Sequence, residues 1–405
     1  MSYKPSTEKY YWLLFLVTPA IGFIIAILNF NKKPLRKFIV LFGLFYAFVF
    51  IPIPGSDATR IISSYEAYDL SDYFTDITSI YNDRGKKPDL YIYTVYSLSK
   101  VFDLSPRGFR VLLGLIYFSF LVKLIGQLYD LSRSRMSNVA KLFLLGGIFV
   151  ISISAGLNGV RWPLAFVVFL YGSLKYNVKT KFKYFLLAGL SIFIHFSFLP
   201  AVIVFGLLVF IPALKNVRIM YVLLLLAFFG GQFVSNYVFS SATEIGGVYE
   251  SKLGNYTSDG YLEKRASRQA SWNFYVPIVR YGNYYFSIFS LFMLSLYRKK
   301  INIDPTAQRL VIFSLITLIF SFLAGGVLDI ATNRYIHIVS FSTLASLFYL
   351  TGQNKGISLF RNLALIYFPV AFITIFSLLR VDIQTVDISI FSNFFIEFIL
   401  GSNNA

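Results

Sequence analysis

Five cationic or titratable side chains lie at the ends of apolar segments, where chemistry at a membrane surface would need them. They are Arg161, Arg280, Arg334, His195 and His337. Arginine stays charged and donates bidentate hydrogen bonds from a planar group, which suits phosphate. An arginine in the centre of a membrane helix costs roughly 2.5–3.5 kcal/mol on insertion scales, so Arg161 in "GLNGVRWPLAFVVF" calls for an explanation. We predict that the three arginines bind a membrane-bound anion.

Each of these residues also has a structural interpretation. Arg161 would serve as an interface anchor, and Arg280 and Arg334 would reach lipid headgroups from helix ends. A packing or capping role accounts equally well for His195, and better for His337. The position of Arg161 beside a polar break favours a functional role for that arginine.

The composition indicates a membrane protein. Of 405 residues, 57% are hydrophobic and 14% are charged, whereas soluble domains carry about 25% charged residues. The apolar runs are continuous rather than alternating, which favours helices over a barrel. The chain has no cysteine and only two histidines, so thiolate chemistry and a histidine-rich metal site are excluded. We predict an all-α polytopic membrane protein that uses no metal and no cofactor.

About twelve apolar segments have the character of membrane-spanning helices. They cover residues 10–30, 36–53, 108–129, 140–155, 159–175, 183–194, 197–212, 219–239, 279–297, 309–328, 334–350 and 362–379. Four are short for a span of about 20 residues. These four form two pairs, 140–175 and 183–212, and each pair turns at a polar or proline-containing break. Broken membrane helices normally line a cavity or a buried site, so we expect the chemistry near these breaks.

Loop charges orient the chain as a single integral membrane domain over residues 1–405. Lysine and arginine cluster in short loops that the positive-inside rule makes cytoplasmic, at residues 32–37, 133–141, 175–183, 215–218, 298–309 and 355–361. The large loops 54–107 and 240–278 and both termini are then periplasmic. Within 54–107 we expect a helix near 64–82 and an interfacial helix in "PDLYIYTVYSLSKVF". The net charge of +18 thus reflects topology rather than nucleic-acid binding.

Motif searches narrow the chemistry further. The first apolar run is too long for the apolar core of a signal peptide and is interpreted as a first spanning helix. There is no GxxxxGK[ST], HExxH, GxSxG or dinucleotide fingerprint. Asp57 in "PGSDATR" begins the first large loop, where it is either a chemical group or a cap for the next helix.

Three blocks of the sequence resemble successive segments of the EpsG-like, Wzy-type polysaccharide polymerases. The blocks begin "PGSDATRIISSYEAYDL", "KPDLYIYTVYSLSKVFDL" and "NGVRWPLAFVVFLYGSL". That family shows a G-[ST]-D, then a proline and aromatic pair, then an arginine opening a span, and "FH" about 30 residues later. Matching positions are held by Gly55-Ser56-Asp57, Pro88 with Tyr91, Arg161 and His195, and Arg334 in "NRYIHI" corresponds to a late arginine-tyrosine turn.

The resemblance implies a fold and an activity. The fold would be a membrane glycosyltransferase of GT-C-like architecture. The activity would be polymerisation of undecaprenyl-pyrophosphate-linked repeat units into O-antigen or a related surface polysaccharide, at the periplasmic face of the bacterial inner membrane. A chain-length regulator is a possible partner, and membrane lipids surround the chain. Two departures concern the sugar contacts: no arginine precedes G-S-D, and Trp162 replaces the usual glutamine.

The residues allow an inverting displacement at the anomeric carbon. Arg161 and Arg334, with Arg280 as a further candidate, would stabilise the leaving pyrophosphate. Either His195 or Asp57 would accept the proton of the attacking hydroxyl, and the sequence does not choose between them. Tyrosines of the first loop would stack on sugars, and the candidates are Tyr65, Tyr68 and Tyr91.

Three other functions share parts of this pattern. An O-antigen ligase would differ only in its acceptor, the lipid A core. A flippase or exporter would carry cationic groups through the bilayer, whereas here the intramembrane charge is confined to the outer side. A membrane acyltransferase would need a histidine placed for acyl transfer, which His195 alone does not exclude. The resemblance favours the polymerase.

Overall fold

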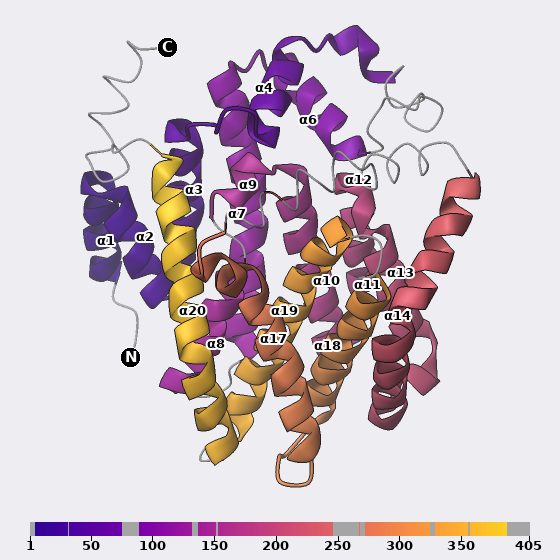
Figure 1. Ribbon diagram of the computed structural model, residues 1–405. Helices are drawn as coiled ribbons and strands as arrows, with labels where there is room; N and C mark the ends of the chain where they lie inside the picture. Colours follow the sequence, from indigo (N-terminus) through magenta and orange to yellow (C-terminus); the bar gives the residue numbers. More distant parts are fainter. Residues whose placement is uncertain are drawn as a thin grey trace.

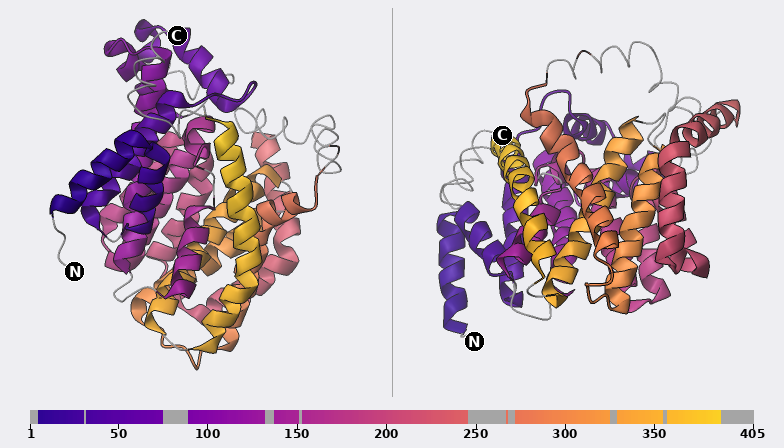
Figure 2. Two further views of the ribbon diagram at one scale, coloured as in Figure 1. Left: turned by 90° about the vertical axis from the view of Figure 1, so that its left-hand side faces the viewer. Right: turned by 60° about the horizontal axis from the view of Figure 1, so that its bottom comes forward.

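The computed structural model is all-helical in the part of the chain that it describes. That part comprises residues 5–30, 32–74, 89–131, 137–150, 153–245, 267, 272–324, 329–354 and 357–386. The long helices run side by side in one bundle, while α4 and α6 lie beyond one of its ends and α1 and α2 lie on its flank (Figures 1 and 2). The helices confirm the predicted class of polytopic helical membrane protein.

The helices follow one another with short connections. Their bounds are α1 Pro5–Val17, α2 Pro19–Leu28, α3 Arg36–Val49, α4 Asp57–Glu66, α6 Leu90–Val101, α7 Pro106–Leu131, α8 Asn138–Ile148, α9 Ala155–Asn158, α10 Arg161–Lys179, α11 Phe182–Gly189, α12 Ser191–Ile194, α13 Leu199–Phe210, α14 Val217–Ile245, α17 Tyr275–Leu296, α18 Pro305–Ala324, α19 Asp329–Gln353 and α20 Ser358–Gln384. Short 3-10 turns include η2 Leu70–Asp72 and η3 Phe196–Phe198.

Four segments are long and apolar enough to cross a membrane unbroken. They are Pro106–Leu131, Pro305–Ala324, Arg334–Gln353 and Ser358–Gln384. The two predicted broken pairs are confirmed as short helices. In the first pair, α8 and α10 are separated by the one-turn helix α9, and in the second, α11 and α12 are followed by η3 and α13. The total of about twelve spans stays a prediction.

Two sequence predictions about helices are wrong. The first apolar run is two helices rather than one, because α1 ends at Val17 and Pro19 opens α2; proline lacks the N–H that a helix interior needs and fits a first turn. The helix expected near 64–82 instead begins at Asp57, where the Ser56 hydroxyl caps it by accepting the Thr59 N–H. It ends at Glu66, and residues 75–88 lie outside the described part.

Helix α10 forms the centre of the bundle. Every residue from Pro163 to Leu174 except Tyr171 is buried, as expected of a helix that is apolar all round. It packs against α7, α11 and α18. At Gly172 a Cβ would collide with the Ala188 backbone of α11, so the two helices approach as closely as small residues permit. The surrounding helices therefore hold the start of α10 in a fixed position.

The two ends of the bundle differ in chemistry. At one end the basic loops meet: Arg36 pairs with Asp130 at 3.3 Å, and Arg309 Nε donates to the Asn177 carbonyl at 2.5 Å. We call this the basic end. The opposite end, called the site end, carries α4, α6 and the starts of α7, α10 and α19 (Figure 1). The loops predicted to be cytoplasmic thus gather away from the predicted site residues.

Candidate functional site

The site end is built around the break that precedes α10. Val160 has φ +42°, a region that a β-branched residue rarely adopts and that costs about 1–3 kcal/mol. A buried carboxylate on α20 holds the chain just before the break, because Asp382 accepts the N–H groups of Ile153 at 3.1 Å and Ser154 at 2.8 Å. The break is therefore fixed by side-chain contacts from a distant helix, and it places Arg161 at the first position of α10.

Arg161 is held by a carboxylate that precedes α6. Its Nη1 donates to Asp89 Oδ2, and the two residues are only 9% and 4% exposed. The second oxygen of Asp89 accepts the Phe196 N–H at 2.9 Å. Removing one member of such a pair leaves a buried charge uncompensated and costs about 3–5 kcal/mol. Asp89 thus joins α6, α10 and the turn that contains His195.

Arg161 keeps further donors for another anion. A guanidinium has five N–H groups, and the hydrogen bond to Asp89 uses the Nη1 group. Asp89 therefore neutralises the arginine and fixes its orientation without using its full donor capacity. Sequence reasoning counted Asp89 only among the loop acids. Its sequence signal is an acid placed directly before the aromatic helix "LYIYTVY", but its partner lies 72 positions away.

His195 lies in the turn between α12 and η3, and Ser197 defines its hydrogen bonding. The Ser197 N–H lies 3.2 Å and the Ser197 hydroxyl 2.8 Å from His195 Nδ1. Because Nδ1 accepts the backbone N–H, a neutral ring carries its proton on Nε2. His195 in this geometry presents an N–H donor at Nε2. Accepting a proton at Nδ1 would break the backbone bond to Ser197.

The start of α19 reaches the same turn. The Tyr335 hydroxyl donates to the Ser197 carbonyl at 2.8 Å. One turn further along, the His337 ring packs edge-on against Trp162, with 5.7 Å between ring centroids. Trp162 follows Arg161 directly, so the α10 and α19 starts are in contact at the site end. Arg334, which precedes Tyr335, is brought to this region by the same helix.

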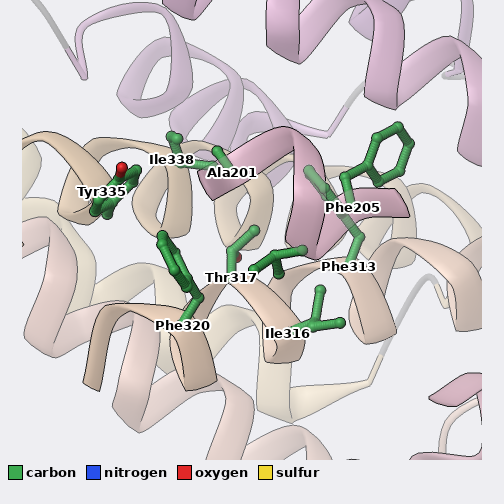
Figure 3. Close-up of a pocket in the computed structure, with 9 residues that line it drawn as sticks. Ala201, Phe205, Phe313, Ile316, Thr317, Phe320, Tyr335 and Ile338 are labelled. Atoms are coloured by element: carbon green, nitrogen blue, oxygen red, sulfur yellow. The ribbon is translucent and has the colours of Figure 1, made fainter. Parts of the chain in front are cut away.

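An apolar hollow lies beside this turn, between α13, α18 and α19 (Figure 3). Phe205, Phe313 and Phe320 line it together with Tyr335. Tyr335 therefore touches the hollow with its ring and the His195 turn with its hydroxyl. An apolar recess next to a polar turn suits an amphipathic ligand.

Arg280 and Asp57 lie at the edge of this arrangement. Arg280, on α17, is exposed and stacks 4.5 Å from the Trp272 ring centroid. His337 lies within its electrostatic range. Asp57 is exposed and pairs with Arg60 at 2.5 Å on the same helix. Among the described residues no contact joins Asp57 to the His195 turn, so the structure brings Arg161, His195 and Tyr335 together but not Asp57.

The three candidate tyrosines belong to the packing of α4 and α6. Tyr65 is 2% exposed, with Phe109 stacked on its ring at 4.4 Å and Lys100 over it at 4.8 Å. Its hydroxyl donates to the Leu104 carbonyl. Tyr68 shares a 3.0 Å hydrogen bond with Ser97, and burial raises the pKa of Tyr91. Stacking of a sugar on Tyr65 would require this packing to open. Glycan binding by the three stays a prediction, and Pro88 lies outside the described residues.

A family model describes most of the chain. It matches residues 59–386 and is that of the EpsG family. The chain belongs to the EpsG family. This EpsG-like family consists of polysaccharide polymerases, so the predicted resemblance is confirmed. The matched segment contains Arg161, His195, Arg280 and Arg334, whereas Asp57 precedes it. Comparison with curated proteins and with solved structures gave no match.

Proposed function

We propose that this EpsG-family protein polymerises lipid-linked oligosaccharide repeat units into a surface polysaccharide of O-antigen type. The observation that carries the proposal is the contact between Arg161 and Asp89, which joins α6, α10 and the His195 turn at the end opposite the basic loops. By the positive-inside rule that end faces the periplasm. The protein would then work in the bacterial inner membrane on undecaprenyl-pyrophosphate-linked glycans.

The reaction is a single inverting displacement. A hydroxyl oxygen of the acceptor glycan forms a bond to the anomeric carbon of the donor glycan, while the bond from that carbon to the pyrophosphate oxygen breaks. The electron pair leaves with the pyrophosphate, so negative charge grows there. Arg161, Arg334 and Arg280 would stabilise that charge, because donors already in position need no rearrangement during the reaction.

The proton of the acceptor hydroxyl passes to a base, and the candidates are His195 and Asp57. For His195 this transfer costs the hydrogen bond from the Ser197 N–H. The alternative role for His195 is to donate from Nε2 to a substrate oxygen, and Asp57 would then take the proton. The apolar hollow between α13, α18 and α19 would hold the first isoprene units of the lipid carrier, since it adjoins the His195 turn through Tyr335.

Deletion and complementation test the proposal. We expect deletion of the gene in its host to leave a single repeat unit on the carrier's acceptor and no glycan ladder on a gel. Wild-type protein restores the ladder, and so does Arg60→Ala, a control on an exposed ion pair at the same end. If deletion instead leaves bare lipid A core while lipid-linked polymer accumulates, the protein is a ligase. An unchanged ladder after deletion would contradict both functions.

A further inference from the structure

A second arginine at the site end lies in a different environment from Arg161. Arg110 is in the first turns of α7, and it lines a hollow between α4, α7 and the segment before α10. The rest of the lining is apolar and consists of Phe50, Ala58, Ile61, Ile62, Leu113, Leu157 and Val160. This hollow is lined by different residues from the hollow beside Tyr335.

Arg110 lacks the compensation that Arg161 has. Its Nε is buried and has no hydrogen-bond partner among the described residues. The charged group whose field acts on it is another cation, Arg107. The amide oxygen of Asn158, between the lining residues Leu157 and Val160, is also buried without a partner in the described part of the chain. Buried polar groups are nearly always satisfied, so this cluster calls for a ligand.

The chemistry of the hollow defines that ligand. A buried guanidinium without a carboxylate needs an anion, and phosphate oxygens match its planar donors. Apolar walls from α4 and α7 suit a hydrocarbon chain attached to that anion. An orphaned amide oxygen accepts a hydroxyl, as a sugar would supply. One molecule that carries all three groups is a prenyl pyrophosphate with a sugar attached.

We propose that Arg110 binds the pyrophosphate of a second lipid-linked glycan, in a subsite separate from that of Arg161, Arg280 and Arg334. This inference rests on the proposed function, because joining two lipid-linked repeat units requires two carriers in the protein at once. The two subsites lie on either side of the break before α10. Val160 lines the Arg110 hollow, and the next residue, Arg161, belongs to the other subsite.

Equilibrium binding of geranylgeranyl pyrophosphate to the purified full-length protein in detergent tests the subsite. Wild-type protein is expected to bind two molecules, and Arg110→Gln is expected to bind one, or the second about tenfold or more weakly, as loss of a charge-assisted hydrogen bond predicts. The matched control is Arg107→Gln, on the same helix, whose guanidinium stacks on Phe48 at 5.0 Å. This control is expected to bind two molecules.

Two further measurements make the test decisive. Ile62→Trp fills the hollow from α4 without altering Arg110, and it should also lose one molecule; it replaces Arg110→Gln if thermal unfolding shows that variant to be misfolded. Inorganic pyrophosphate, geranylgeraniol and phosphatidylglycerol micelles serve as competitors. Equal competition by inorganic pyrophosphate or by phosphatidylglycerol would overturn the assignment to a prenyl pyrophosphate, and wild-type binding by folded Arg110→Gln or Ile62→Trp would overturn the subsite.

Failure of the subsite differs from failure of the proposed function. If deletion of the gene abolishes the ladder but Arg110→Gln binds two molecules, the polymerase stands and the subsite is wrong. If Arg110-dependent binding is present but deletion leaves the ladder intact, the lipid-binding site stands and polymerisation is wrong.

Discussion

Arg161 and Arg110 lie at the same end of the bundle and differ in what the protein supplies to them. Arg161 has Asp89, which neutralises it and links it to the Phe196 N–H. Arg110 has an apolar hollow and a neighbouring arginine. A buried arginine with its own carboxylate is a structural element that retains donors for a ligand. A buried arginine without one depends on the ligand for its compensation, so the two should respond differently to mutation.

The largest effect is expected from the carboxylate. Asp89→Ala leaves Arg161 buried without a counter-charge and should lower the free energy of unfolding by about 3–5 kcal/mol. Thermal or denaturant unfolding in detergent measures the loss. The control, Asp57→Ala, breaks an exposed pair with Arg60, for which a change below about 1 kcal/mol is expected. Equal stabilities for the two variants would contradict the structural role given to Asp89.

A second prediction separates catalysis from folding at the arginines without a buried carboxylate partner. Arg334→Ala should lower the polymerisation rate by about 10²–10³, because it removes a donor aimed at the developing charge, while the unfolding midpoint stays near that of the wild type. The rate is measured with purified lipid-linked repeat units. A normal rate would make Arg334 an interface anchor, leaving the comparison of Arg161 with Arg110 to carry the site.

A third prediction concerns the orientation of His195. Ser197→Ala removes the hydroxyl that contacts Nδ1 at 2.8 Å but keeps the backbone N–H. Loss of about 1 kcal/mol of hydrogen bonding predicts a rate about fivefold lower, with stability little changed. Rate and unfolding are measured on the same preparation. An unchanged rate would show that the ring is oriented by other contacts.

The smallest effect distinguishes the two arginines by its sign. Arg110→Leu replaces an uncompensated buried charge with an apolar side chain, so the ligand-free protein should gain about 1 kcal/mol of stability. Arg161→Leu should lose stability, since it strands Asp89. Unfolding of both variants in lipid-free detergent gives the comparison. A loss of stability in Arg110→Leu would show that Arg110 has a structural partner.

The sequence predicted the features that depend on local chemistry. Polar and proline residues inside apolar runs correctly located the two broken helix pairs, and the motif order correctly indicated the EpsG family. Pro19, which divides the first run, was visible in the sequence, but its break was missed because the hydropathy of the run is continuous. Local pattern thus identified most helices and placed Arg161 and His195 at turns.

The features that were not predicted depend on contacts between distant segments. Asp89 is 72 positions from Arg161 and 107 from Phe196, and a loop acid gives no local sign of either partner. Tyr65 has the look of a loop aromatic, but Phe109 and Lys100 cover its ring. Arg110 follows a proline at an ordinary helix start, and its lack of a partner emerges only when α4 and α9 pack against α7. Tertiary packing decides such roles.

The central claim is that Arg161 serves the reaction as well as the fold, and the double variant Asp89→Asn with Arg161→Gln tests it most directly. Neither residue remains charged, and the two amides can still hydrogen-bond, so the protein should unfold near the wild-type temperature. We predict that this folded variant, expressed in the deletion strain, builds no glycan ladder. A folded double variant with a normal ladder would contradict the account, because Arg161 would then be only the partner of Asp89.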